Sequence, residues 1–286
     1  MADDGSGATV RRMWLASELK AWRIPTGDTA ERVAAELGWS HSKLSRIEGA
    51  RAGVSATDAA ALCRHYNVPA DRAAAIDRVA REARQRTWYQ RDYADVVLDW
   101  FGQYVGLEGS AVELQTFEGL VIPGLLQTKA YAEAVTRASL VDATADEVSR
   151  KVSFRMDRQA ILERDDGKPH VWAILAEGVI RQEVGGRKVM KEQLDHLERL
   201  ATGPDVTLQI LPYAAGAHAA MTGPFVLMTF PEPFPPVAYT DHLTSSAYLQ
   251  EPPDVARYKL MFQHLIARAL DTDRSLNLLR EVRASM

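Results

Sequence analysis

Apolar residues recur at three- and four-residue spacing through most of the first 86 residues, and this period predicts helices rather than strands. In the first helix, Leu15, Leu19 and Trp22 fall on one face, which should pack against a core. The helices expected from the pattern cover residues 11–22, 29–37, 41–48, 56–66 and 69–86. The N-terminal part of the chain is therefore predicted to be an all-α domain.

Polar residues that can cap a helix mark where the second and third helices begin. Asp28 or Thr29 can cap the second helix and Ser40 the third, because their side-chain oxygens accept hydrogen bonds from free backbone amides. Gly38 lies between the two helices and can adopt the left-handed conformation of a tight turn. These signals predict two short helices joined by a short turn.

The pattern changes in the second part of the chain, where runs rich in β-branched and aromatic residues alternate with helical segments. Helices are expected over 125–138, 144–164, 186–202, 252–271 and 272–285, and strands over 170–177, 205–213, 223–232, 236–243 and 245–251. Because several consecutive strands are joined by short turns, we expect a mostly antiparallel sheet covered by helices. The fold class predicted for the C-terminal domain is α+β.

An aromatic-rich segment, residues 87–111, separates the two regions. It contains Trp88, Tyr89, Tyr93, Trp100, Phe101 and Tyr104. These rings can fill a joint between domains or form a cage around a ligand, and we favour the joint because large rings dominate buried interfaces. The expected organisation is a disordered tail (1–10), an N-terminal domain (11–86), this joint (87–111) and a C-terminal domain (112–286).

Composition limits the class of protein. Hydrophobic residues make up 47% and charged residues 25% of the chain, as in soluble globular proteins. No apolar run approaches the roughly 18 residues that a membrane helix needs, and the first residues lack the features of a secretory signal. The single cysteine, Cys63, cannot form an internal disulfide. We therefore expect a cytoplasmic protein without a membrane partner.

Charge is unevenly distributed along the chain. The net charge of −4 is unlike that of a general nucleic-acid binder. Residues 1–86, however, hold 14 lysines and arginines against 11 aspartates and glutamates, whereas residues 87–286 hold 20 against 27. Because phosphate neutralisation is local, the mildly basic N-terminal domain can bind DNA although the whole chain is acidic.

The segment GWSHSKLSRIEGAR, residues 38–51, carries the clearest candidate chemistry. Its expected helix turns Leu44 and Ile47 inward and rests on the helix before it. On the outer face, His41, Ser42 and Arg46 could reach base edges. Lys43 and Arg51 would meet phosphates. The alternative from charge alone is an ordinary surface helix with a basic face.

The spacing of this segment favours DNA recognition. A cap serine, three polar residues, then Leu44, Ser45, Ile47 and Glu48, followed by a glycine and a basic residue, resembles the phage-repressor-like (XRE-like) helix-turn-helix family of bacterial regulators. The resemblance implies a helix that reads the major groove of double-stranded DNA. It also implies that Glu48 makes structural contacts within the domain.

The start of the second helix departs from that family's pattern. Ala30 stands where the family often has a glutamine that contacts a backbone phosphate, and Asp28 stands where an apolar residue is usual. The resemblance suggests that Thr29 partly replaces the glutamine. The residues that we expect to contact DNA are Thr29, Ser40, His41, Ser42, Lys43, Arg46 and Arg51.

Four blocks in the second domain extend the resemblance. Residues 121–135, 153–164, 172–186 and 206–233 resemble, in the same order, the partner domain of the WhiJ-like actinobacterial regulators. This resemblance implies a transcription factor whose second domain has no established chemistry. It also implies a small protein partner encoded nearby, in an arrangement like a toxin–antitoxin pair.

An enzymatic second domain is the weaker alternative. His218 lies in a glycine-flanked loop, and Tyr213, Asp241 and His242 on nearby segments could complete an acid–base site. No nucleophile elbow, zinc-protease motif or phosphate-binding loop occurs in the sequence, and its later histidines lack metal-ligand spacing. We therefore expect no enzyme activity, no cofactor and no metal.

The sequence thus predicts a sequence-specific DNA-binding transcriptional regulator. Its C-terminal domain would bind either a protein partner or a small-molecule ligand, and the residues do not choose between them. An antitoxin-like protein that acts mainly by binding a small cognate protein is the alternative. We expect a homodimer, because one short helix reads only a few base pairs and a second half-site would supply the missing specificity.

Overall fold

The computed structural model describes residues 7–83, 87–97, 99–242 and 245–286. Within the chain, two units have their own internal packing. The first comprises the residues up to Asp92 together with Val105–Ser110, and the second comprises Tyr93–Tyr104 and Ala111–Met286.

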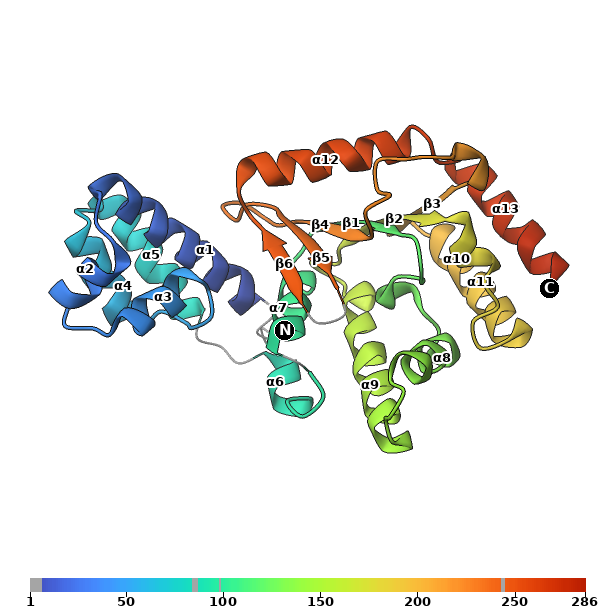
Figure 1. Cartoon of the computed structure of the whole chain (residues 1–286), viewed down its shortest axis with the longest axis horizontal. Coiled ribbons are helices and arrows are strands. Elements are labelled where there is room, and N and C mark those ends of the chain that lie inside the picture. Colours follow the sequence, from blue (N-terminus) through green and yellow to red (C-terminus); the bar gives the residue numbers. More distant parts are fainter. Residues whose placement is uncertain (1–6, 84–86, 98, 243–244) are drawn as a thin grey trace. The chain divides into compact units, whose positions relative to one another are not determined.

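Helices form the first unit (Figure 1). They are α1 (Gly7–Arg23), α2 (Ala30–Glu36), α3 (His41–Glu48), α4 (Ala56–His65), α5 (Ala70–Glu82) and α6 (Trp88–Asp92), with a 3-10 turn at Ile24–Thr26 after α1. The expected helices are all present. Residues 84–86, which we expected at the end of the fifth helix, lie outside the described residues.

The first helix begins earlier than its periodicity predicts. Ala8 and Val10 are buried within α1, so residues 7–10 are helical rather than part of a tail. Residues 1–6 of the expected tail lie outside the described residues. Leu15 and Leu19 are fully buried and confirm the predicted core face of this helix.

A six-stranded sheet organises the second unit, with the order β3-β2-β1-β4-β5-β6. Its strands are β1 (Glu113–Glu118), β2 (His170–Ala176), β3 (Val206–Leu211), β4 (Phe225–Thr229), β5 (Val237–Asp241) and β6 (Ser246–Leu249). The predicted strands are present, and β1 is an additional strand in the middle of the sheet.

The expectation of a mostly antiparallel sheet is wrong, because the sheet is mixed. β1 pairs with β2, and β2 with β3, in parallel. The pairs β1–β4, β4–β5 and β5–β6 are antiparallel. The physical reason is the length of the connections: helices separate β1 from β2 and β2 from β3, and parallel strands require such crossovers. Only the later strands are joined by segments without a helix.

Helices cover the two faces and one edge of this sheet (Figure 1). They are α8 (Lys129–Ser139), α9 (Ala145–Arg158), α10 (Glu177–Arg181), α11 (Arg187–Ala201), α12 (Pro252–Ile266) and α13 (Thr272–Ser285). On one face, Phe262 of α12 packs against Phe117 and Phe225 of the sheet. The other face is the side of α8, α9 and the first part of α7 (Asp99–Glu108).

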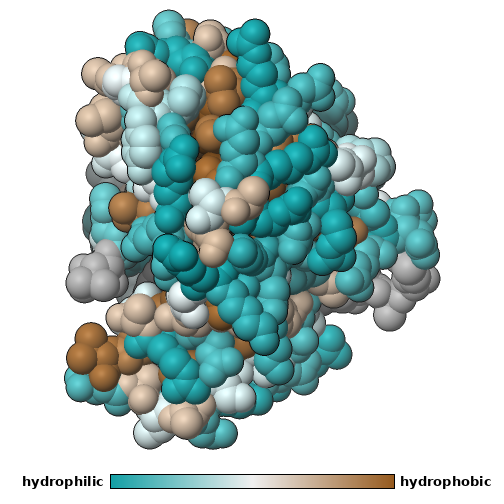
Figure 2. Space-filling model, turned by 90° about the vertical axis from the view of Figure 1, so that its right-hand side faces the viewer, coloured by the Kyte–Doolittle hydropathy of each residue, from teal (hydrophilic) through white to brown (hydrophobic). Residues whose placement is uncertain are grey.

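The side of the second unit that carries α11 and α13 is mostly hydrophilic, and apolar residues show there only in small patches between polar ones (Figure 2). Charged side chains join the two helices: Arg280 pairs with Glu198 at 2.6 Å, and Arg283 pairs with both Glu198 and Asp195. These exposed pairs are screened by solvent and contribute little to stability. This side is therefore an ordinary solvated surface.

Within the part of the chain that the structure describes, no helix is both long enough and apolar enough to cross a lipid bilayer.

Candidate functional site

The helices α2 and α3 form the geometry of a helix-turn-helix. Thr29 caps α2 by accepting a hydrogen bond from the amide of Arg32 at 3.3 Å, and Ser40 caps α3 by accepting one from the amide of Lys43 at 3.2 Å. Between the helices, Gly38 has a φ of 69°, in the left-handed region that glycine adopts without strain. The capping residues and the turn are as the sequence predicts.

The inner side of α3 is anchored in two ways. Leu44 and Ile47 are buried, as predicted. At the C-terminal end of the helix, Glu48 accepts two hydrogen bonds from the Arg23 guanidinium, at 2.7 and 2.9 Å. Glu48 thus has the structural role expected for it. Arg23, which the sequence analysis did not single out, positions α3 from a helix 25 residues earlier.

The outer side of α3 presents Ser42 and Arg46 to solvent, and Arg51 is exposed just beyond the helix. Among the described residues, no side chain forms a hydrogen bond or an ion pair with any of these three. An exposed guanidinium with no internal partner can form a bidentate contact with guanine or a phosphate without breaking an existing bond. Arg46 and Ser42 are therefore available for base contacts, and Arg51 for a phosphate.

A shallow hollow lies beside these residues. It has a volume of ≈ 210 Å³ and is lined by Ser40, Ser42, Lys43, Arg46, Ile47, Ala52 and Gly53. Four of the seven predicted DNA-contact residues therefore line one concave surface. Thr29, His41 and Arg51 lie outside it.

Two of the predicted contact residues already have internal partners. The Lys43 ammonium donates to Asp58 Oδ1 at 2.7 Å and lies 3.9 Å from the centre of the Trp39 ring. His41 Nε2 lies 2.9 Å from Glu31 Oε1. To contact DNA, Lys43 and His41 would have to leave these internal partners or bind the DNA in addition to them. Trp39 and Asp58 carry no sequence signal that would have identified them as partners of Lys43.

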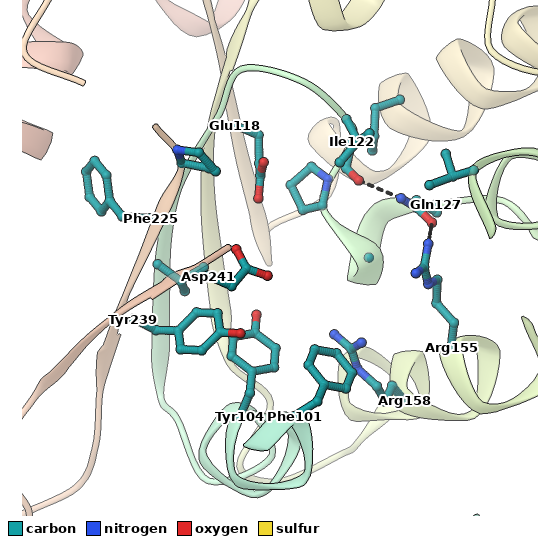
Figure 3. A pocket seen from close by; sticks show the side chains of 16 residues that line it. Phe101, Tyr104, Glu118, Ile122, Gln127, Arg155, Arg158, Phe225, Tyr239 and Asp241 are labelled. Carbon is teal, nitrogen blue, oxygen red and sulfur yellow. Dashed lines mark hydrogen bonds between the residues drawn. The ribbon is translucent and has the colours of Figure 1, made fainter. Parts of the chain in front are cut away.

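The second unit contains a cavity of ≈ 160 Å³ on the face of the sheet opposite α12. Its lining comes from α7, β1, the segment after β1, α8, α9, the start of β4 and β5. Glu118 and Asp241 project from the strands, while Arg155 and Arg158 project from α9 on the opposite wall (Figure 3). Phe101 and Tyr104 of α7 stack with a centroid distance of 5.5 Å. The sequence analysis missed this cavity as a site.

Burial shifts the titration of the charged groups in the cavity. It raises the pKa of Glu118 to about 8, with the nearby Asp241 carboxylate adding to the effect. Burial also raises the pKa of Asp241, although that side chain keeps contact with solvent. On the other wall, burial and the charge of Arg158 lower the pKa of Arg155 to about 10. Each wall therefore holds groups whose charged forms are disfavoured.

This titration predicts a pH-dependent contribution of Glu118 to stability. The folded chain holds the Glu118 proton more tightly than the unfolded chain does. The resulting stabilisation is therefore complete at a pH below about 4.3, the pKa of a glutamate in the unfolded chain, and is lost as the pH rises through about 8, the pKa in the folded chain. In Glu118→Gln the titration is absent. Between about pH 5 and about pH 9, we expect the melting temperature to fall less in the variant than in the wild type.

The matched control for this pH series is Glu113→Gln, at the other end of the same strand and outside the cavity. Its melting temperature should follow that of the wild type at every pH. If Glu118→Gln also follows the wild type throughout the series, the assignment of a raised pKa to Glu118 is wrong.

The residues weighed for an acid–base site do not come together. His218 packs on Phe117 with a centroid distance of 5.3 Å, on the face of the sheet that α12 covers. Asp241 lines the cavity on the other face, and Tyr213 is exposed in a 3-10 turn. His218 Nδ1 instead accepts a hydrogen bond from the amide of Ala220 at 3.3 Å. Among the described residues, no group of three or more histidine, cysteine or acidic side chains could hold a metal ion.

Comparison with known proteins gives two family matches. Residues 14–76, which contain α2 and α3, match a helix-turn-helix domain. Residues 101–281, more than half of the chain, match a domain of unknown function, DUF5753. The chain belongs to the DUF5753 family. No curated protein and no solved structure matches it.

The two matches assign the coarse class of the protein. The helix-turn-helix domain indicates a DNA-binding regulator. The DUF5753 domain contains every residue that lines the cavity, from Phe101 to Asp241. The expected membership in a WhiJ-like actinobacterial group, and in the XRE-like family, stays a prediction.

Proposed function

We propose that this chain is a sequence-specific transcriptional regulator that reads the major groove of DNA with α3. The observation that carries this proposal is the two-sided character of α3. Leu44, Ile47 and Glu48 hold its inner side, whereas Ser42 and Arg46 face solvent without described internal partners. A recognition helix needs this combination of a fixed position and free donors.

The residues around α3 divide into two groups by what they can contact. Arg46 and Ser42 lie on the exposed helical face and would read base edges, with His41 beside them. Arg51 beyond the helix, Ser40 and Thr29 at the capped ends and Lys43 are placed for phosphates. Binding as a homodimer would present two such helices to half-sites about one helical turn apart.

The test begins with selection of an operator from a pool of random duplexes by the full chain. On the selected duplex, Arg46→Ala should weaken binding by about 1–3 kcal/mol, roughly 5- to 150-fold, because a bidentate base contact is lost. The loss should disappear when the base pair that Arg46 reads is changed. Titration of labelled duplexes measures both values.

Two arginine variants serve as comparisons. Arg51→Ala should weaken binding to all duplexes alike. It should also reduce the slope of the logarithm of the binding constant against the logarithm of the salt concentration by about 1, as expected for one phosphate contact. It is preferable to Lys43→Ala, which would also remove the partner of Asp58. Arg78→Ala, exposed on α5, should change nothing. Equal losses for Arg46→Ala and Arg51→Ala on every duplex would contradict base reading by α3.

We propose that the second unit regulates this DNA-binding activity. The partly open cavity supports a small-molecule ligand over the protein partner that the sequence left equally open, because its polar groups line a small concave space rather than a broad flat surface.

A further inference from the structure

The cavity of the second unit has carboxyl groups on one wall and guanidinium groups on the opposite wall, and among the described residues no ion pair joins Glu118 or Asp241 to Arg155. On the sheet wall, no lysine or arginine among the described residues lies within ion-pair distance of Glu118 or Asp241. On the helix wall, no described carboxylate lies within ion-pair distance of Arg155. Glu118 and Arg155 are half-buried, whereas Asp241 is exposed. Removing a charge from water without a partner is costly, so Glu118 and Arg155 are the groups that gain most from a bound counterpart.

The helix wall is arranged to receive an anion. Arg155 donates one hydrogen bond, to Gln127 Oε1 at 2.7 Å, and Gln127 is itself fixed by donating to the carbonyl of Ile122 at 2.7 Å. Arg158 lies one helical turn further along α9, with its guanidinium 5.1 Å from the centre of the Phe101 ring. Two neighbouring guanidinium groups favour a carboxylate or a phosphate between them.

The sheet wall is arranged to receive a cation or a hydrogen-bond donor. Glu118 comes from β1 and Asp241 from β5, which β4 separates in the sheet, and both side chains point into the open space (Figure 3). Their proximity makes it unfavourable for both to be charged while the cavity is empty. An ammonium group placed between them would remove that repulsion.

A third polar group in the cavity lacks a partner. The hydroxyl of Tyr239 is buried, the residue is only 4% exposed, and no described residue forms a hydrogen bond of normal geometry with it. Burial and the nearby Asp241 carboxylate raise the pKa of this hydroxyl. Figure 3 shows the hydroxyl directed toward the interior of the cavity. Buried hydroxyls are nearly always bonded, so a bound molecule is the natural partner of this one.

The space between the charged walls is small and largely apolar. Val121, Ile122, Pro123, Val135, Pro224 and Val226 contribute to it. The volume of ≈ 160 Å³ is below the roughly 300–1,000 Å³ of sites for drug-sized ligands. It suits a compact molecule with an apolar body rather than a nucleotide or a peptide.

The position in the sheet also favours a binding site. Glu118 is the last residue of β1, the strand at which the pairing changes from parallel, with β2, to antiparallel, with β4. In open α/β sheets, ligands bind beyond the carboxyl ends of strands where the strand order reverses. The cavity lies at that end of β1.

We propose that this cavity binds a small zwitterion with an apolar body, of the size and chemistry of an apolar amino acid. The carboxylate lies against Arg155 and Arg158, the ammonium lies between Glu118 and Asp241, and the Tyr239 hydroxyl bonds the ligand between them. This inference is independent of DNA binding, so either proposal can fail without the other.

The test is calorimetric titration and thermal melting of the full chain with the standard L-amino acids. At least one apolar member should bind with a dissociation constant below about 1 mM and raise the melting temperature of the second unit. The matching acid without the amine, and the matching amine without the acid, should each bind at least about tenfold more weakly. A half-ligand that binds as tightly as the zwitterion would overturn the proposal, as would no binding by any amino acid at about 1 mM.

Variants assign the two ends of the ligand. Arg155→Gln should weaken binding of the zwitterion at least about tenfold. The variant should then bind the zwitterion no more tightly than the amine that lacks the carboxylate. Glu118→Gln should bind the zwitterion no more tightly than the acid that lacks the ammonium group. Arg137→Gln and Glu113→Gln, which change exposed or distant charges in the same unit, should bind like the wild type.

A milder variant covers the case in which a charge variant fails to fold. Tyr239→Phe retains the ring, which packs 4.6 Å from that of Tyr104, and removes only the hydroxyl. It should fold as the wild type does and weaken the zwitterion roughly two- to tenfold. Unchanged affinity in Tyr239→Phe together with wild-type affinity in Glu118→Gln would show that the cavity is not the binding site.

Discussion

Glu48→Ala should destabilise the first unit by about 2–4 kcal/mol, measured as the loss in free energy of unfolding. The Arg23 and Glu48 side chains are only 15% and 9% exposed, so the ion pair is largely shielded from solvent. Without Glu48, Arg23 keeps a single hydrogen bond, to the carbonyl of Asp28 at 2.7 Å. Most of the loss comes from the Arg23 guanidinium, because removing one partner of a buried ion pair leaves the charge of the other without compensation.

The effect should extend to DNA binding, because the same pair fixes the C-terminal end of α3. The matched control is Asp77→Ala, which removes a carboxylate from an exposed pair with Arg81 in the same unit. That variant should lose no more than about 0.5 kcal/mol. Chemical denaturation of both variants makes the comparison. Similar small losses in both would mean that the Arg23–Glu48 pair does not anchor α3.

Gln193→Leu should destabilise the second unit by about 2–4 kcal/mol, because it leaves two buried backbone groups without partners. Gln193 is fully buried on α11. Its Oε1 accepts from the amide of Thr128 at 2.7 Å, and its Nε2 donates to the carbonyl of Leu126 at 2.7 Å. Leucine has a similar volume and can satisfy neither group. The loss can be measured as the change in free energy of unfolding of the second unit.

The neighbouring Glu192→Leu introduces the same side chain at an exposed position of α11 and should change stability by less than about 0.5 kcal/mol. Equal behaviour of the two variants would exclude a structural role for the Gln193 hydrogen bonds. The segment that Gln193 holds also carries Gln127, the residue that orients Arg155. We therefore expect Gln193→Leu to weaken ligand binding in the cavity as well.

Local signals in the sequence were enough to predict five helices of the first unit. Thr29 and Ser40 form the predicted caps, Gly38 forms the predicted turn, and Leu44 and Ile47 are buried as their spacing indicates. Each of these features depends on residues that are close in the sequence, which is why pattern alone identifies them. The Arg23–Glu48 pair depends on the packing of two distant helices, and no pattern contains it.

The sheet of the second unit shows where pattern reading fails. β1 has the sequence ELQTFE, with a glutamate at each end and no β-branched residue except Thr116, so it resembles a loop. Its identity as a central strand comes from pairing with β2 and β4, which are remote in the sequence. The parallel pair β2–β3 was open to prediction, since a helix was expected between those strands, but the short turns later in the chain dominated the interpretation.

The two candidate sites differ in the same way. The predicted DNA-contact residues fall within one short stretch, and the structure places four of them around one hollow. The cavity is assembled from seven separate segments, so its acidic and basic groups had no common signature in the sequence. Phe101 and Tyr104, which we assigned to a joint between domains, line this cavity.

The central position of β1 has a consequence for how the chain folds. Glu113 of β1 pairs with His170 on one side and with Thr229 on the other, so the middle of the sheet closes only across long loops. Pairings between remote residues slow folding because the loop entropy is lost before the contacts form. The helices of the first unit, by contrast, depend mostly on nearby residues. During synthesis we therefore expect the first unit to fold before β4, the second partner strand of β1, has been synthesised.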